Sequence, residues 1–350
     1  MRKFLMTLIL ALAAVQCTSQ ASSEGAGTPC VFSNPIAPGA DPWVLEKDGL
    51  YYFSESHGGA VHISVSESMT DIKSGSQKVW EQPRSGWNSA HLWAPELHYV
   101  RGNWYIYYTA GESGPPFIHQ RSGVLRAVTD DPLGEYEDLG MLYTGDDIAT
   151  KKDAKWAIDL TVLEMNQQLY AIWSGWEENA ETDRTPQHLY IAQMENPWTV
   201  SSNRVKISSP EEPWEAGTEL AINEGPQVLK NGSDVFIVYS ASESWLPTYN
   251  LGLLKLRSPD ADLLDPQSWV KEGSVFQGEG NIFGVGHASF TTSPDGSENW
   301  IYYHTKSSPD PGWNRAIHLQ PFNWRENGRP DFGRPIQPGV AIEKPSGSCW

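Results

Sequence analysis

The stretch WYIYYTA at residues 104–110 is the clearest fold signal in the sequence. Its aromatic and β-branched residues are typical of a β-strand, and it ends in small polar residues. Related stretches are LYYFSES at residues 50–56, LYAIWSG at 169–175, VFIVYSA at 235–241 and WIYYHTK at 300–306. Their even spacing, mostly about 65 residues, indicates that the chain repeats one structural unit five times.

A turn signal precedes each of these stretches, and another short strand-like run precedes each turn. The turns contain KDG, RGN, NQQ, NGSD and PDGSEN. Asp-Gly and Asn-Gly pairs tolerate the positive φ angles of tight hairpins. The runs before the turns are WVLE, LHYV, TVLEM, QVLK and ASFTTS. The repeating unit is therefore a strand, a hairpin turn and a second strand, followed by a longer variable stretch.

The repeat predicts an all-β fold, a five-bladed β-propeller with four-stranded antiparallel blades around a central funnel. A unit of about 65 residues has room for four strands and their loops. No long segment keeps a helical apolar period free of Gly and Pro, and the 31 Gly and 25 Pro favour tight turns. Two packed β-sandwiches are the alternative, but a domain boundary would interrupt the even spacing.

The composition restricts the partners of the protein. The 350 residues carry a formal net charge of −18, no basic block offsets it, and 11% of the residues are aromatic. Binding to nucleic acid or to an anionic membrane requires clustered Lys and Arg, so neither is an expected partner. Carbohydrates suit such a surface better, because aromatic rings offer flat apolar faces and carboxylates accept hydrogen bonds from hydroxyl groups.

The first residues have the pattern of an export signal. Two basic residues precede an apolar run over residues 4–15, which is too short to span a bilayer as a helix. We expect residues 1–21 to be a signal peptide and residues 22–350 to be one catalytic propeller domain. The signal ends either at a small-residue cleavage site at Ala21 or at Cys17, which would carry lipid. The mature protein would be a monomer without a transmembrane segment, located in the periplasm, on the cell surface as a lipoprotein, or outside the cell.

The remaining cysteines stand at the two ends of the mature chain. Cys30 and Cys349 can form a disulfide in an exported protein, and a closed ring would place the two ends together. The alternative is two unrelated buried thiols. We expect the disulfide.

Five polar residues stand near the start of the first strand of each unit: Asp41, Glu96, Asp159, Glu224 and His287. In a propeller the equivalent ends of the innermost strands surround one funnel mouth, so these residues should converge on one cavity. Like charges placed together raise one another's pKa and destabilise the fold. A structural role would explain one isolated acid, but proteins tolerate a matched set of acids mainly at functional sites.

Glycoside hydrolysis uses carboxylates in a neutral, aromatic pocket. One carboxylic acid protonates the leaving oxygen, and a second carboxylate activates water or attacks the sugar. The two groups need different pKa values, and a third negative charge or burial can keep the acid protonated.

The sequence resembles glycoside hydrolase family 43, which comprises five-bladed arabinofuranosidases, arabinanases and xylosidases. The resemblance covers essentially the whole mature chain and is carried by NPIAPGADPWV, WAPELHYVRGNWYIYYTA, WAIDLTVL and INEGPQV, in order and at blade spacing. It implies that Asp41 is the catalytic base, Asp159 the modulator of pKa and orientation, and Glu224 the general acid of an inverting reaction. Glu96 has no catalytic role in the family pattern, so we interpret it as a supporting residue.

The resemblance also suggests residues that bind substrate or an ion. Arg315 in the segment GWNRAIHLQPFNW could donate to sugar hydroxyls, and Trp93 is a candidate platform for a sugar face. His57 in ESHGG is a further candidate for the pocket lining. In many relatives a histidine at the position of His287 contacts a central ion or its waters, so we weigh a structural Ca²⁺ or Na⁺ at the funnel axis against a histidine hydrogen-bonded to neighbouring strands. The chemistry itself needs no cofactor, and no phosphate loop, zinc spacing or dinucleotide motif is present.

The sequence therefore predicts an exported, inverting α-L-arabinofuranosidase that releases terminal arabinose units from arabinan, arabinoxylan or arabino-oligosaccharides of the plant cell wall. Long polar loops at residues 111–121 and 177–186 could wall a pocket. A β-xylosidase or an endo-arabinanase on the same scaffold is the first alternative, because sugar specificity depends on contacts that the sequence does not reveal. A non-catalytic sugar-binding propeller is the alternative from another class, and the presence of all three acids favours catalysis.

Overall fold

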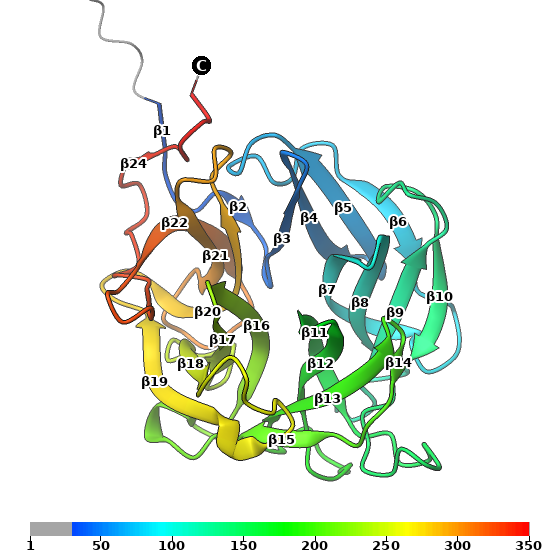
Figure 1. Ribbon diagram of the computed structural model, residues 1–350. Helices are drawn as coiled ribbons and strands as arrows, with labels where there is room; N and C mark the ends of the chain where they lie inside the picture. Colours follow the sequence, from blue (N-terminus) through cyan, green and yellow to red (C-terminus); the bar gives the residue numbers. More distant parts are fainter. Residues whose placement is uncertain (1–29, 350) are drawn as a thin grey trace, which may run out of the picture.

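The computed structural model describes residues 30–349 as five antiparallel sheets arranged in a ring (Figure 1). The first two blades are consecutive four-stranded meanders. Blade I consists of β3 (Trp43–Lys47), β4 (Leu50–His57), β5 (Ala60–Ser66) and β6 (Gln77–Glu81). Blade II consists of β7 (Ala90–Val100), β8 (Asn103–Gly111), β9 (Arg121–Ala127) and β10 (Tyr136–Met141).

The remaining three blades follow the same order, and two of them carry short additional strands. Blade III contains β11 (Ala157–Met165), β12 (Gln168–Gly175), β13 (His188–Asn196), β14 (Thr199–Val200) and β15 (Val205–Ser208). Blade IV contains β16 (Asn223–Asn231), β17 (Asp234–Ala241), β18 (Asn250–Leu256) and β19 (Trp269–Gln277). Blade V contains β20 (Phe283–Thr292), β21 (Asn299–Lys306), β22 (Arg315–Trp324), β23 (Pro330–Asp331) and β2 (Ala37–Pro38).

This arrangement confirms the predicted five-bladed propeller and excludes two packed sandwiches. Within residues 30–349 the only helical segments are two 3₁₀ turns, η1 (Pro213–Glu215) and η2 (Pro266–Ser268). The expected hairpins join the first and second strands of every blade. At the β3–β4 turn, Asp48 and Gly49 both have the positive φ angles, 56° and 80°, that a tight hairpin requires.

The core lies between neighbouring blades, which explains why the second strand of each unit is apolar on both faces. Every residue of β8 except Asn103 is buried. One face of this strand packs on blade III through Tyr105 and Tyr107, and the other packs on blade I through Trp104 and Ile106. A strand between two packed sheets has no solvent face, so it lacks the alternation of a half-exposed strand.

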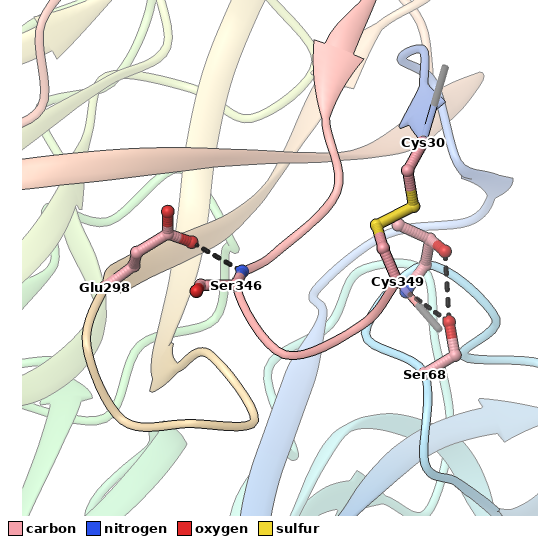
Figure 2. The surroundings of a disulfide bond; sticks show 6 residues. Cys30, Ser68, Glu298, Ser346 and Cys349 are labelled. Carbon is pink, nitrogen blue, oxygen red and sulfur yellow. Dashed lines mark hydrogen bonds between the residues drawn. A yellow bond between two sulfur atoms is a disulfide. The ribbon is translucent and has the colours of Figure 1, made fainter. Parts of the chain in front are cut away.

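The two ends of the chain close the ring at blade V. The N-terminal β2 pairs with β22 as an outer strand, and β1 (Val31–Phe32) pairs with β24 (Ile342–Glu343). The predicted Cys30–Cys349 disulfide is confirmed, with the two Cα atoms 6.1 Å apart (Figure 2). Nearby, the Ser346 amide donates to the carboxylate of Glu298 at 2.9 Å. These contacts hold the last blade to the first part of the chain.

The predicted signal peptide at residues 1–21 and the candidate lipid site Cys17 lie outside the described residues. Within the described part of the chain, no helix has the length and apolar character needed to cross a membrane.

Candidate active site

A break in the innermost strands aims side chains into the funnel. Asp41 has φ 50°, Asp159 has φ 54° and His287 has φ 46°, in the left-handed region that non-glycine residues rarely adopt. Around Asp159 and His287 the pairing of the inner strand with its neighbour shifts, as in a β-bulge. A bulge re-aims a side chain, and strained backbone is concentrated at functional sites, so the three positions form one functional level of the funnel.

The same backbone break identifies the equivalent residues in the other two blades and corrects the alignment made from the sequence. In blade II it falls at Ala94 (φ 40°) and in blade IV at Gly225 (φ 53°). Glu224 therefore precedes the equivalent position by one residue, and Glu96 follows it by two. Buried Glu96 does not line the cavity described below but contacts Gln227 and His98, with its carboxylate 2.9 Å from the His98 ring, which fits a supporting role.

One cavity of about 650 Å³ opens at this level of the funnel. Six of the seven predicted catalytic and substrate-binding residues line it: Asp41, Trp93, Asp159, Glu224, His287 and Arg315. His57 does not, and its prediction was wrong in this respect. It ends β4 in an exposed position, and its ring lies 5.9 Å from the ring of His62 on β5 of the same blade.

Asp41 is held in its ionised form. Its carboxylate lies 3.2 Å from Arg315 Nη1 and 3.3 Å from His287 Nδ1, and 25% of its side chain is exposed. Its backbone N–H donates to His304 Nδ1 at 3.1 Å. Burial alone would raise the pKa of Asp41, but Arg315, together with His287, outweighs this and holds the pKa well below its ordinary range. This carboxylate can therefore act as a base.

Asp159 and Glu224 are both buried and compete for one negative charge. Burial, together with the like charge of Asp41, raises the pKa of each carboxyl to about 7. The charged form of Asp159 is favoured by the Gly225 N–H, which donates to its Oδ2 at 3.0 Å, and by nearby His287. The charged form of Glu224 is favoured in turn by the Tyr249 hydroxyl and by Arg315, so near neutral pH the pair can hold one proton beside one negative charge.

Most of the remaining cavity wall comes from loops between the second and third strands of four blades. The sequence analysis expected loops 111–121 and 177–186 to form walls, and they supply Phe117, Asp183 and Arg184. The analysis missed further lining residues, among them Trp156, Trp245 and Trp313. The sequence marks these positions only by their residue type. The chain has 16 tryptophans and most of them pack between blades, so a tryptophan alone does not indicate a cavity residue.

The described residues do not fit a protein-ligated ion at the axis. Among residues 30–349 no group of three or more His, Cys, Asp and Glu side chains could hold a metal ion. The Nδ1 atom of His287 faces the Asp41 carboxylate instead. The ion beside His287 stays a prediction, and no step of the reaction below depends on it.

A carboxyl with a lowered pKa and two with raised pKa values share one cavity, which indole rings and a guanidinium line. This arrangement suits acid–base chemistry on a neutral polar substrate, of the kind that hydrolyses glycosides. The model of glycosyl hydrolases family 43 matches residues 32–330, and the chain belongs to this family.

Individual relatives match most of the chain. An extracellular exo-α-(1→5)-L-arabinofuranosidase of Streptomyces avermitilis is 34% identical and covers 96% of this chain and 70% of the relative. An α-L-arabinofuranosidase of Humicola insolens is 32% identical over 97% of this chain and 70% of its own length. The crystal structure of an α-L-arabinofuranosidase from Lactobacillus brevis superposes with a TM-score of 0.79 at 31% identity, covering 88% of this chain and 98% of that one.

Proposed function

We propose that this protein is an exo-acting α-L-arabinofuranosidase that releases terminal arabinofuranosyl units from arabinan, arabinoxylan or arabino-oligosaccharides by inversion. The observation that carries the proposal is a pair of carboxyl groups in one cavity whose pKa values are shifted in opposite directions, that of Asp41 down and that of Glu224 up. The relatives described above are named as arabinofuranosidases, and each matches most of this chain. This supports arabinose over xylose as the released sugar.

In the proposed reaction Asp41 removes a proton from a water molecule as the water attacks the anomeric carbon. Glu224 transfers its proton to the departing glycosidic oxygen on the other side of the sugar. Inverting glycosidases place such carboxyl groups roughly 6.5 to 9.5 Å apart, which leaves room for the water. Asp159 and Glu224 repel each other when both are charged, so an ionised Asp159 would favour the protonated acid before the bond breaks.

Two features of the cavity support the release of single terminal units. Loops of four blades supply lining residues above the carboxyl groups, among them Phe117, Arg184, Trp245 and Trp313. Arg184 forms an ion pair with Glu219, which lies in the segment between β15 and β16, so the loop of blade III is tied to the connection into blade IV. Walls on several sides favour a pocket for a chain end over a groove that a continuous polymer crosses.

Export of the protein is part of the proposal. The Cys30–Cys349 disulfide fits an oxidising compartment, and the names of two related enzymes describe them as extracellular. The segment 1–21 would then direct export. Cleavage at Ala21 would release a monomeric enzyme, whereas lipid at Cys17 would tether it to the cell surface, and either form would meet plant cell-wall polysaccharide.

The proposal is tested by comparing the hydrolysis of nitrophenyl α-L-arabinofuranoside with that of nitrophenyl β-D-xyloside, and by assaying arabinan for released arabinose. We expect turnover of the arabinofuranoside and release of monomeric arabinose. The Glu224→Gln variant should lose the activity on arabinan while remaining folded by circular dichroism. A preference for the xyloside, release of oligosaccharides alone, or full activity of Glu224→Gln would each refute the proposal.

A further inference from the structure

A buried tyrosine lies directly behind the proposed acid. The hydroxyl of Tyr249 donates to Glu224 Oε1 at 2.9 Å, and only 1% of the Tyr249 surface is exposed. Burial raises the pKa of this phenol far above its ordinary value, so the hydroxyl keeps its proton and acts as a donor. Tyr249 does not line the substrate cavity.

This hydrogen bond decides which oxygen of Glu224 carries the acidic proton. An oxygen that accepts the Tyr249 hydroxyl at 2.9 Å behaves as the carbonyl oxygen of the carboxylic acid. The proton therefore resides on Oε2, the oxygen left free to meet the leaving group. A proton on Oε1 would face the phenol instead of the glycosidic oxygen.

The position of the Tyr249 ring is fixed from two sides. Its ring stacks on His304 with 5.5 Å between centroids and 9° between planes. On another side it meets Gly286, where a Cβ atom would lie 1.9 Å from Tyr249 Cε1. His304 accepts the Asp41 N–H, so this pair of stacked rings connects the backbone of the base with the side chain of the acid. Burial lowers the pKa of His304 to about 4, which keeps its Nδ1 available as that acceptor.

We propose that Tyr249 is a positioning residue, which orients Glu224 so that Oε2 donates its proton to the leaving oxygen, and that Gly286 and His304 hold Tyr249 for this task. The inference rests on the proposed function, because it assigns Glu224 the role of acid. Tyr249 itself contacts neither substrate nor water in the reaction.

The test compares the dependence on the leaving group in wild type and Tyr249→Phe. A dinitrophenyl arabinofuranoside has a leaving group that departs without a proton, whereas a methyl arabinofuranoside requires the acid. General acid catalysis contributes roughly 10²- to 10⁴-fold, so Tyr249→Phe should lower kcat/KM for the methyl glycoside by about 10-fold or more and for the dinitrophenyl glycoside by less than about 3-fold. Gly286→Ala should show the same selective loss, because its Cβ displaces the Tyr249 ring.

A second readout is the pH profile. The hydroxyl of Tyr249 stabilises the ionised form of Glu224, so its removal should move the alkaline limb of kcat/KM to higher pH. The matched control is Tyr303→Phe, which removes another buried hydroxyl, bonded to Gln320 at 2.8 Å, and should show neither effect.

Equal losses on the two glycosides, or an unmoved alkaline limb in Tyr249→Phe, would overturn the positioning role while the wild-type enzyme still hydrolyses both substrates. A wild-type protein that hydrolyses neither glycoside would overturn the proposed function, and the role of Tyr249 with it.

Discussion

Replacing Arg315 with methionine should move the acidic limb of the pH profile. Asp41 lies 3.2 Å from the Arg315 guanidinium, and 15% and 25% of the Arg315 and Asp41 side chains are exposed, so solvent screens the pair only in part. Two unit charges at that distance attract by roughly 5 kcal/mol at an effective dielectric constant of about 20, before desolvation is subtracted. Arginine beside an aspartate typically lowers its pKa by about 1 to 3 units.

The direction follows from the form that catalysis needs. The ionised Asp41 is the base, so activity falls as pH drops through its pKa. In Arg315→Met the positive charge that offsets the burial of Asp41 is gone, so the pKa of Asp41 rises. Activity is then lost at a higher pH than in wild type. We expect the acidic limb to move up by about 1 to 3 units.

The assay is kcat/KM for nitrophenyl α-L-arabinofuranoside over a broad pH range. The position of the limb is the readout, because Arg315 also lines the cavity and its loss can weaken binding at every pH. Arg315→Lys is the matched control, since it keeps the positive charge and should leave the limb closer to wild type. An acidic limb that stays in place in Arg315→Met would refute the assignment of Asp41 as a base stabilised by Arg315.

Two further changes test separate parts of the account. Asp159→Asn removes a negative charge near Glu224 but keeps an oxygen that accepts the Gly225 N–H. The alkaline limb of the pH–rate profile should therefore move to lower pH. An unmoved limb, in a variant whose rate is limited by chemistry, would exclude the modulator role. Replacing Cys30 and Cys349 by serine should lower the free energy of unfolding by at most about 5 kcal/mol, measured by denaturant unfolding with and without reductant, while activity of the folded enzyme persists. Equal stability of the oxidised wild type and the double variant would contradict a closing role of the disulfide.

The sequence predicted the fold well because its signals are local and repeated. Five aromatic strands, each after a turn signal, are sufficient to count the blades, and the ring then brings the two terminal cysteines together. The closing strand β2 was not predicted, since Ala37–Pro38 has no strand signal of its own and pairs with β22 only after the ring has formed.

The sequence predicted that the catalytic carboxylates share one cavity, but it predicted fewer of the residues around them. The repeat aligned Asp41, Asp159 and His287 correctly, but it could not detect the backbone break that places Ala94, and not Glu96, at the same level. Tyr249 was missed because it lies in a loop outside the repeated strands and contacts Glu224 only through tertiary packing. Residues that act through contacts between blades leave no periodic signal in the chain.

The most direct measurement of the central claim is proton NMR of the first sugar released from an α-L-arabinofuranoside, recorded before the product anomers equilibrate. If Asp41 directs water to one face of the sugar while Glu224 protonates the leaving group on the other, the β-anomer of arabinose appears first. Initial appearance of the α-anomer would show retention of configuration and would contradict the roles assigned to these two residues.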